Sequence, residues 1–299
     1  MIDWAAPDLG FIKNCAEICG KSRRFGSDTA LANIYLLSRK YGTETALYGG
    51  ALLRYYNGST PNRRGYGFPL CPEGTDIRGI FDALAEDAVR RGVPLSFCLC
   101  DERQAAELGR FFTINASFTD DDSDYIYKRD SLAALAGRKL HRKRNHIAAF
   151  NRLYDDIRTE RITGGNAADA LTVAEKWLEE REPAPDELAE FDSISTALRN
   201  MEPLGLFGLI LYVDDVPAAM TLASHISDIC TDVHYEKAWG EYAANGAFAV
   251  INNMLASSPE ADREYINREE DMGIEGLRTA KESYYPAFKL RKYYGVCKC

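Results

Sequence analysis

The spacing of apolar residues in the second half of the chain predicts a regular series of helices and strands. Residues 167–181 and 188–198 carry apolar side chains three or four positions apart, which predicts two amphipathic helices. Alternating residues then predict a hairpin of strands 206–213 and 218–226, joined at Asp214 and Asp215. The elements expected after it are a strand at 232–239, a helix at 246–257, a strand at 264–267, a helix at 276–284 and a final strand at 288–296.

The first half shows a less regular version of the same alternation. The elements expected there are a short helix or irregular segment at 25–41, a hairpin at 41–56, strands at 65–70, 95–99 and 125–127, and helices at 76–91 and 101–110. A further helix is expected from Ser131, as its N-cap, to Tyr154. The pattern predicts an α/β protein with mixed sheets, in which residues 1–130 form one domain, 131–155 a linking helix and 156–299 a second domain.

Length and composition agree with two ordinary globular domains. A chain of 299 residues fits two hydrophobic cores of about 150 residues each better than one large core. Apolar residues make up 46% of the chain and charged residues 27%, which is typical of soluble globular proteins. No apolar run approaches the ~18 residues that span a bilayer, and the amino terminus, with Asp3 and Asp8, does not resemble a signal peptide. We therefore expect a cytoplasmic location.

Cysteines and net charge exclude some classes of site. The chain has eight cysteines, but Cys98 and Cys100, like Cys297 and Cys299, are not in the Cys-x2-Cys spacing of structural zinc sites. We expect free thiols and no metal. The net charge of -9 argues against a protein that coats nucleic acid, although a local basic patch can still bind phosphate.

Charged residues gather where the strand at 264–267 ends. Tyr265 and Ile266 form the apolar approach, and Gly273 and Gly276 interrupt the chain before the next helix. Open α/β sheets bind ligands at the carboxyl ends of their strands. The charged run is therefore a candidate site, and a solvated loop is the alternative.

Four segments of this sequence resemble one bacterial family. They are 265–286, the basic segment 135–150, Asp124 to Tyr127, and His234 to Ala238. In their order along the chain, they resemble segments of largely uncharacterised proteins similar to the C-terminal catalytic domain of phosphatidylglycerol lysyltransferase. The resemblance implies two acetyltransferase-like (GNAT) domains in tandem, as in the Fem peptidoglycan aminoacyltransferases, and an amino acid taken from aminoacyl-tRNA.

An acyl transferase needs a route for the acceptor's proton and donors for the oxyanion of the tetrahedral intermediate. The catalytic candidates are Glu236, Glu270, Lys281 and Tyr284. The substrate-binding candidates are Lys237, Asn267, Arg268, Glu269 and Asp271. Carboxylates among them would meet the ammonium group of the amino acid, and the cations would restrain those carboxylates. Lys281 and Tyr284 share one face of a helix, and the alternatives for them are a surface salt bridge and a core aromatic.

Strand alternation sorts these candidates by face. Glu236 and Lys237 should point to opposite faces of their strand, so only one of them can reach the cleft. By the same alternation, Asn267 should share a face with Glu269, and Arg268 should share a face with Glu270.

The basic segment is a second candidate site, for phosphate. Its residues are Arg138, Lys139, Arg142, Lys143 and Arg144. They would bind the acceptor arm of tRNA or an anionic lipid headgroup. The alternative is a solvated helix between the domains, neutralised by nearby acidic side chains.

Acetyltransferases bind coenzyme A by a glycine-rich loop that begins a helix. The corresponding turn in this chain runs from Gly240 to Ala247. Here the loop lacks the first basic or amide residue and one glycine, and Glu241 would repel phosphate. Coenzyme A is therefore disfavoured at this turn. The function that the family resemblance implies is transfer of an aminoacyl group from tRNA to an amine or hydroxyl of a lipid, peptide or small molecule. Acyl transfer from coenzyme A, or noncatalytic binding of tRNA or an amino compound, are the alternatives; no Ser-His-Asp arrangement stands out among the four histidines.

Overall fold

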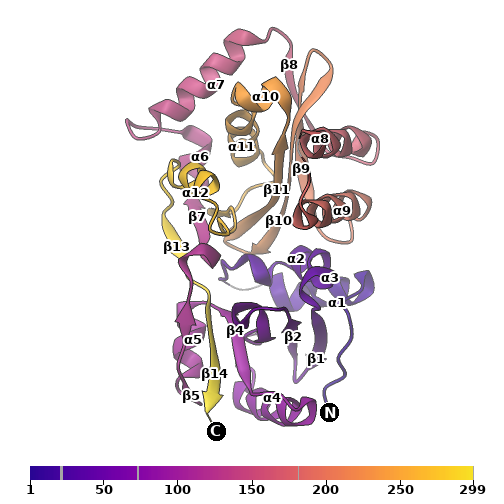
Figure 1. Ribbon diagram of the computed structural model, residues 1–299, viewed down its shortest axis with the longest axis vertical. Helices are drawn as coiled ribbons and strands as arrows, with labels where there is room; N and C mark the ends of the chain where they lie inside the picture. The colour runs from indigo at the N-terminus through magenta and orange to yellow at the C-terminus, as the bar shows by residue number, and fades with distance from the viewer. Residues whose placement is uncertain (21–22, 73, 181, 299) are drawn as a thin grey trace.

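Two seven-stranded mixed sheets lie end to end along the long axis of the molecule (Figure 1). The computed structural model describes residues 1–20, 23–72, 74–180 and 182–298. The first sheet has the order β1-β2-β3-β4-β14-β5, with β6 also paired to β14. Its strands are β1 (Glu44–Tyr48), β2 (Ala51–Asn57), β3 (Arg64–Tyr66), β4 (Ser96–Cys100), β5 (Thr113–Ile114), β6 (Ser117–Phe118) and β14 (Tyr293–Lys298).

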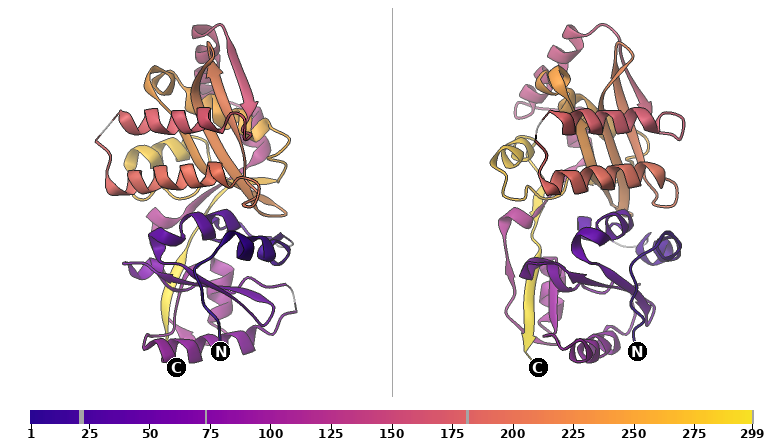
Figure 2. Two further views of the ribbon diagram at one scale, coloured as in Figure 1. Left: turned by 90° about the vertical axis from the view of Figure 1, so that its right-hand side faces the viewer. Right: turned by 45° about the vertical axis from the view of Figure 1, so that its right-hand side comes forward.

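The second sheet has the order β13-β7-β12-β11-β10-β9-β8. Its strands are β7 (Asp124–Lys128), β8 (Ile157–Arg161), β9 (Phe207–Val213), β10 (Val216–Ser227), β11 (Cys230–Ala238), β12 (Tyr265–Asn267) and β13 (Phe288–Leu290). Helices α8 (Ala167–Glu179) and α9 (Pro185–Arg199) run side by side over one face (Figure 2). Helix α11 (Ala247–Ser257) packs on the other face, and its apolar side chains form a core with β9, β10, β11 and α6 (Arg129–Ala134).

A further set of helices belongs to the first half. They are α1 (Leu9–Gly20), α2 (Leu31–Leu36), α3 (Ser38–Tyr41), α4 (Ile77–Arg91) and α5 (Glu102–Leu108), with short 3-10 turns η1 (Ser27–Thr29), η2 (Pro61–Arg63) and η3 (Asp120–Asp122). Apolar residues of α1 and α2 share a core with α8, α9 and the second sheet. The two halves are therefore packed together through α1 and α2.

The two sheets repeat one pattern of strand pairing. In the first, β1, β2 and β3 are antiparallel neighbours, and α4 connects β3 to the parallel strand β4. In the second, β9, β10 and β11 are antiparallel neighbours, and α11 leads to the parallel strand β12. This repeat agrees with the tandem architecture expected from the sequence.

Each half of the chain supplies one strand to the other sheet. Strand β7, expected to complete the first unit, pairs with β12 and β13 in the second sheet. The C-terminal segment, expected as one strand at 288–296, is broken at Arg291 and Lys292; β13 stays in the second sheet and β14 pairs with β4 in the first. The expected strand assignments were wrong at these two places, because local alternation does not specify the pairing partner. The domain ranges drawn from the sequence stay a prediction.

The expected long helix from Ser131 to Tyr154 is two helices. Helix α6 ends where Leu135 takes a left-handed backbone, with φ of 47°, and α7 spans His141–Leu153. Gly137, with φ of 82°, continues the turn, and the Arg144 side chain donates to the carbonyl oxygens of Leu135 and Gly137. Ser131 lies inside α6 and is not its N-cap.

A buried ion pair joins the two places where the chain crosses between sheets. The Lys292 ammonium lies 2.5 Å from Asp124, the first residue of β7, and 3.3 Å from Glu270. Arg63 of the first half also pairs with Glu270, at 2.7 Å. Burial raises the pKa of Asp124 to about 6, although Lys292 acts in the opposite direction. The crossing therefore depends on a charge that is only 2% exposed.

We expect Lys292→Met to destabilise the fold by about 3–5 kcal/mol, because it leaves the buried Asp124 carboxylate without its cation and leaves Glu270 with Arg63 alone. Urea unfolding followed by circular dichroism measures the change. Lys176→Met, at an exposed pair on α8, is the matched control and should stay within about 0.5 kcal/mol. Asp124→Asn added to Lys292→Met should recover part of the loss, and an unchanged urea midpoint in Lys292→Met would contradict this account.

Candidate active site

Strands β11 and β12 run in parallel for only a short distance and then separate. Their pairing covers Cys230 to Asp232 on β11, and β11 continues to Ala238. A β-bulge lies at His234, because Val233 pairs with Ala223 while Tyr235 pairs with the adjacent Leu222. Bulges redirect side chains and are frequent beside active sites.

After the bulge, Glu236 and Lys237 of β11 face opposite sides of the sheet, as expected. Glu236 contacts Asn252 of α11. Lys237 turns to the α8 and α9 side, where its ammonium pairs with Glu190 at 2.9 Å and lies 3.6 Å from the Trp177 ring centroid. The structure thus separates Lys237 from the other candidates.

Five side chains gather where β11 and β12 separate, and we call them the splay cluster: Glu236, Arg268, Asn252, Lys143 and Tyr284. One Glu236 oxygen accepts from Arg268 Nη2 at 2.9 Å and the other from Asn252 Nδ2 at 3.1 Å. Arg268 lies over the Tyr284 ring at 4.9 Å, and the Lys143 ammonium is 3.9 Å from the centroid of the same ring. The cluster joins α7, β11, α11, the end of β12 and the end of α12 (Glu275–Glu282).

Two polar atoms of the splay cluster are buried and unsatisfied. Arg268 Nη1 and Asn252 Oδ1 have no hydrogen-bond partner among the residues that the structure describes. The first is a charged donor and the second is an acceptor, and both belong to side chains held by Glu236. Buried polar groups normally have partners, so this pair leaves one donor and one acceptor unused inside the cluster.

Burial shifts the proton affinities of the cluster. Burial, together with the positive charge of Arg268, lowers the pKa of Lys143 to about 8. Burial raises the pKa of Tyr284 to about 12, so its hydroxyl keeps its proton at neutral pH. A lysine that titrates this close to neutral pH can accept a proton from a reacting amine or hydroxyl.

Lys281 holds the backbone that follows β12. Its pKa is lowered to about 8, first by burial and then by Arg268. The ammonium donates to the carbonyl oxygens of three consecutive residues, Arg268, Glu269 and Glu270. An ammonium has three N–H donors, so these contacts use all of them and make Lys281 a positioning residue.

The expected alternation after β12 ends at Asn267. Glu269 has φ of 56°, so Arg268 and Glu270 do not share a face as predicted from strand geometry. Arg268 meets Glu236, whereas Glu270 meets Arg63 and Lys292 at the interface of the halves. The sequence could not anticipate this left-handed turn, since glutamate rarely adopts it.

Two predicted substrate-binding residues are fully buried and bound within the protein. Asn267 donates to the Phe25 carbonyl and to Asp124, and its own side-chain oxygen accepts from the Glu269 N–H. Asp271 accepts from Arg278, Gly273 and Tyr125. These side chains shape the loop and do not line the splay cluster.

A second polar group, which the sequence reasoning missed, surrounds Asn33. Asp232, His234 and Glu269 offer three possible metal ligands within 4.8 Å of one another. The Asn33 amide nitrogen lies 3.1 Å from Asp232 and 2.8 Å from Glu269, and so occupies the space that a cation would need. Burial, followed by the charge of Glu269, raises the pKa of Asp232. Asn33 comes from α2, far away in the sequence, and no local pattern points to it.

The residues of the basic segment do not all lie on one exposed surface. Arg138, Lys139, Arg142 and Arg144 are exposed, while Lys143 turns into the splay cluster. Helix α7 projects from the body of the second half (Figure 1). Arg138 and Lys139 lie in the turn before α7 and not on the expected helix, while Arg142 and Arg144 lie on α7 together with Lys143. We call the four exposed residues the basic ridge.

Most of the chain matches one family of known proteins. Residues 20–295 match the family described as the C-terminal part of phosphatidylglycerol lysyltransferase. The chain belongs to this family. The resemblance predicted from the sequence is thereby confirmed. The family is named for a lysyltransferase, that is, for an enzyme that transfers an aminoacyl group.

Solved structures of family members and more distant proteins share the fold. A conserved protein of unknown function from Bacteroides thetaiotaomicron has 30% identity over 100% of both chains and a TM-score of 0.92. L-PGS from Bacillus licheniformis has 13% identity and a TM-score of 0.66, with 97% of this chain and 92% of that chain covered. FemX has 8% identity and a TM-score of 0.65, covering 99% and 97%. These likenesses confirm the predicted fold class.

Comparison with functionally curated proteins finds no significant match. Within the described parts of the chain, no helix has both the length and the apolar character to cross a bilayer.

We expect the Lys143 side chain to titrate with a midpoint of about 8 in two-dimensional NMR of the lysine side chains. The Lys143→Arg variant assigns its resonance. Arg268→Met should move the midpoint upward, because it removes a neighbouring positive charge. Exposed Lys176, whose pKa is raised by Glu179, is the internal control. A Lys143 midpoint equal to that of Lys176 would contradict the burial of its ammonium.

Proposed function

We propose that the protein transfers an aminoacyl group from aminoacyl-tRNA to an amine or hydroxyl, and that the reaction takes place at the splay cluster. The observation that carries this proposal is the pair of buried, unsatisfied atoms, Arg268 Nη1 and Asn252 Oδ1. An ester carbonyl can accept from the first, and an attacking amine or hydroxyl can donate to the second. The family's named chemistry supports the same reaction class.

In the proposed mechanism, the oxyanion of the tetrahedral intermediate is stabilised by the Arg268 guanidinium. Neutral Lys143 takes the proton from the attacking group and returns it to the leaving hydroxyl, with the Tyr284 hydroxyl as a proton relay between them. Glu236 holds Arg268 and Asn252 in place, since both its oxygens are already bound. Glu270 and Lys281 act indirectly, because one anchors the loop to the first half and the other grips its carbonyls.

The loop after β12 supports recognition of an ammonium group. Glu269 is partly exposed, with 26% of its side chain accessible, and it borders a small cavity with Glu270 and Asp28. Two tyrosines, Tyr41 and Tyr56, line the same cavity. Arg63 and Lys292 line the cavity as well and pair with Glu270, and Arg54 pairs with Asp28. Glu269 is therefore the carboxylate of this cavity that is most open to a ligand cation. We therefore propose that a positively charged end of the amino acid lies toward this side.

Coenzyme A is the alternative acyl carrier, and two carboxylates oppose it. The N–H of Gly240, at the start of α10 (Gly240–Ala244), donates to Glu180, and Glu241 follows directly. A pyrophosphate at this turn would meet both negative charges. This supports tRNA as the donor over acetyl-coenzyme A.

Arg268→Met should lower the rate of aminoacyl transfer about 100- to 1,000-fold, as expected for the loss of one oxyanion donor. The assay follows tRNA charged with labelled amino acids, with hydroxylamine as a small surrogate acceptor. Arg161→Met, at an exposed pair with Glu260, is the matched control and should retain the rate. Glu236→Gln should also lose activity while its circular dichroism spectrum stays unchanged. Full activity in both cluster variants would refute the site, and tRNA binding without consumption would indicate a noncatalytic binding protein.

The exposed basic residues in the turn before α7 and on its first turn should bind the phosphates of tRNA. Replacing Arg138, Lys139 and Arg142 together by Gln should reduce the slope of log K against log salt by about 2–3, because each neutralised phosphate contributes roughly 0.7–0.9. Filter binding at several salt concentrations measures this slope. A matched triple change of exposed Arg90, Arg103 and Arg110 should leave it unaltered, and an equal decrease in both triples would point to net charge alone.

A further inference from the structure

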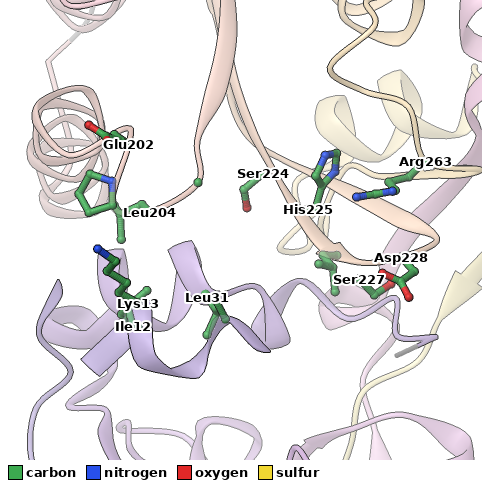
Figure 3. A pocket seen from close by; sticks show the side chains of 14 residues that line it. Ile12, Lys13, Leu31, Glu202, Leu204, Ser224, His225, Ser227, Asp228 and Arg263 are labelled. Carbon is green, nitrogen blue, oxygen red and sulfur yellow. The ribbon is translucent and has the colours of Figure 1, made fainter. Parts of the chain in front are cut away.

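A cavity of about 610 Å³ lies between the two halves, on the side of the second sheet that faces α1 and α2 (Figure 3). Helices α1 and α2 form one wall, and residues 202–205 and 224–228 form the other. Ile12, Leu31 and Leu204 give it an apolar lining. This volume falls in the range of small-molecule sites.

A serine in the wall of this cavity is hydrogen-bonded to a buried histidine. Figure 3 shows the Ser224 hydroxyl directed toward the cavity. Its oxygen lies 2.8 Å from Nε2 of His234, whose side chain has no exposed surface. The bulge at His234 brings the two together, since His234 has no opposite residue on β10. A hydroxyl that reaches a cavity and contacts an imidazole is the geometry of a nucleophile and its base.

The hydrogen bond with the Asn33 amide indicates which nitrogen of the His234 ring carries the hydrogen. Oδ1 of Asn33 lies 3.0 Å from Nδ1 of His234. The amide orientation is set by three acceptors around its nitrogen: the Ser27 carbonyl, Asp232 and Glu269. An amide oxygen only accepts, so Nδ1 of the ring carries the proton. In a neutral ring Nε2 is then the acceptor, and Ser224 donates to it.

Two carboxyl oxygens also lie close to Nδ1 of the ring. The Asp232 carboxylate oxygen lies 3.4 Å from Nδ1 and the Glu269 oxygen 3.8 Å from it. A carboxylate or amide that orients the base is the third member of nucleophile sites on unrelated folds. Ser224, His234 and Asn33 therefore stand in the order of nucleophile, base and orienting group.

We propose that this cavity is a second reaction site, in which Ser224 is the nucleophile and His234 its base toward small carboxylic esters. Ser224 Oγ attacks the ester carbonyl carbon, and its proton passes to His234 Nε2. The C–O bond of the ester breaks, the alcohol leaves with that proton, and an acyl-serine remains. Water then attacks the acyl-serine through the same base, which releases the carboxylic acid and restores the serine.

The charges around the cavity limit the kind of ester. Lys13 and Glu202 lie at one end, and Asp228 and Arg263 at the other (Figure 3). Both ends thus carry both signs of charge. A small neutral or zwitterionic ester fits this rim better than a strongly anionic one. The site shares no residue with the splay cluster, and the inference does not rest on the proposed function.

A small dialkyl fluorophosphate tests the nucleophile directly. The Ser224 oxygen would form a bond to phosphorus as the P–F bond breaks, with fluoride leaving and the proton taken by His234. Intact-mass and peptide mass spectrometry of the full-length protein should find one adduct, on the peptide that contains Ser224. Hydrolysis of p-nitrophenyl acetate should proceed with a burst of about one equivalent.

Three variants separate a reaction site from a structural hydrogen bond. Ser224→Ala should abolish the adduct, and His234→Gln, which keeps the serine, should slow its formation at least about 100-fold. Ser193→Ala is the matched control, because this buried serine contacts a tyrosine hydroxyl instead of an imidazole, and labelling should be unchanged. If Ser224→Ala does not fold, the His234→Gln rate still decides. No adduct at Ser224, or an equal rate in His234→Gln, would overturn the proposal.

Discussion

The architecture depends on a buried ion pair between Asp124 and Lys292. Asp124 begins the strand that the first half gives to the second sheet, and Lys292 lies where the chain returns to the first sheet. Two crossing segments that are far apart in sequence are thus fixed at one point. A buried pair of this kind does not by itself increase stability over an apolar contact. It does specify which strands pair, because either charge alone would be costly inside the protein.

The position of the splay cluster depends on the interface between the two halves. Glu270 is anchored to the first half by Arg63 and Lys292, and Lys281 binds the carbonyls of Arg268 to Glu270. Lys281 therefore fixes the backbone carbonyl of Arg268, and Glu236 fixes its side chain. A donor fixed in this way needs little reorganisation when charge develops on a substrate oxygen. The first half therefore contributes to the proposed chemistry by holding a loop of the second.

The sequence could predict what depends on neighbours along the chain. The helices and strands from Ala167 to Asn267 follow their hydrophobic periods, and Glu236 and Lys237 separate by face as alternation requires. Strand exchange could not be predicted, because pairing partners are chosen across the whole molecule. The left-handed turn at Glu269 could not be predicted either. Asn33, Arg63, Asn252 and Lys292 had no local signal, since each acts on a residue distant in the sequence.

One inserted residue in β11 determines the surroundings of both candidate sites. Without the bulge at His234, strand alternation would place Asp232, His234 and Glu236 on the same face. The extra residue lets Asp232 and His234 contact Asn33 on the α2 side, while Glu236 turns to Asn252 on α11. The extra residue of a β-bulge lacks the regular backbone hydrogen bonds between strands. Such bulges are common where they redirect a side chain toward an active site. The same strand can therefore present an imidazole to one cavity and a carboxylate to the splay cluster, with the sheet itself as the partition between them.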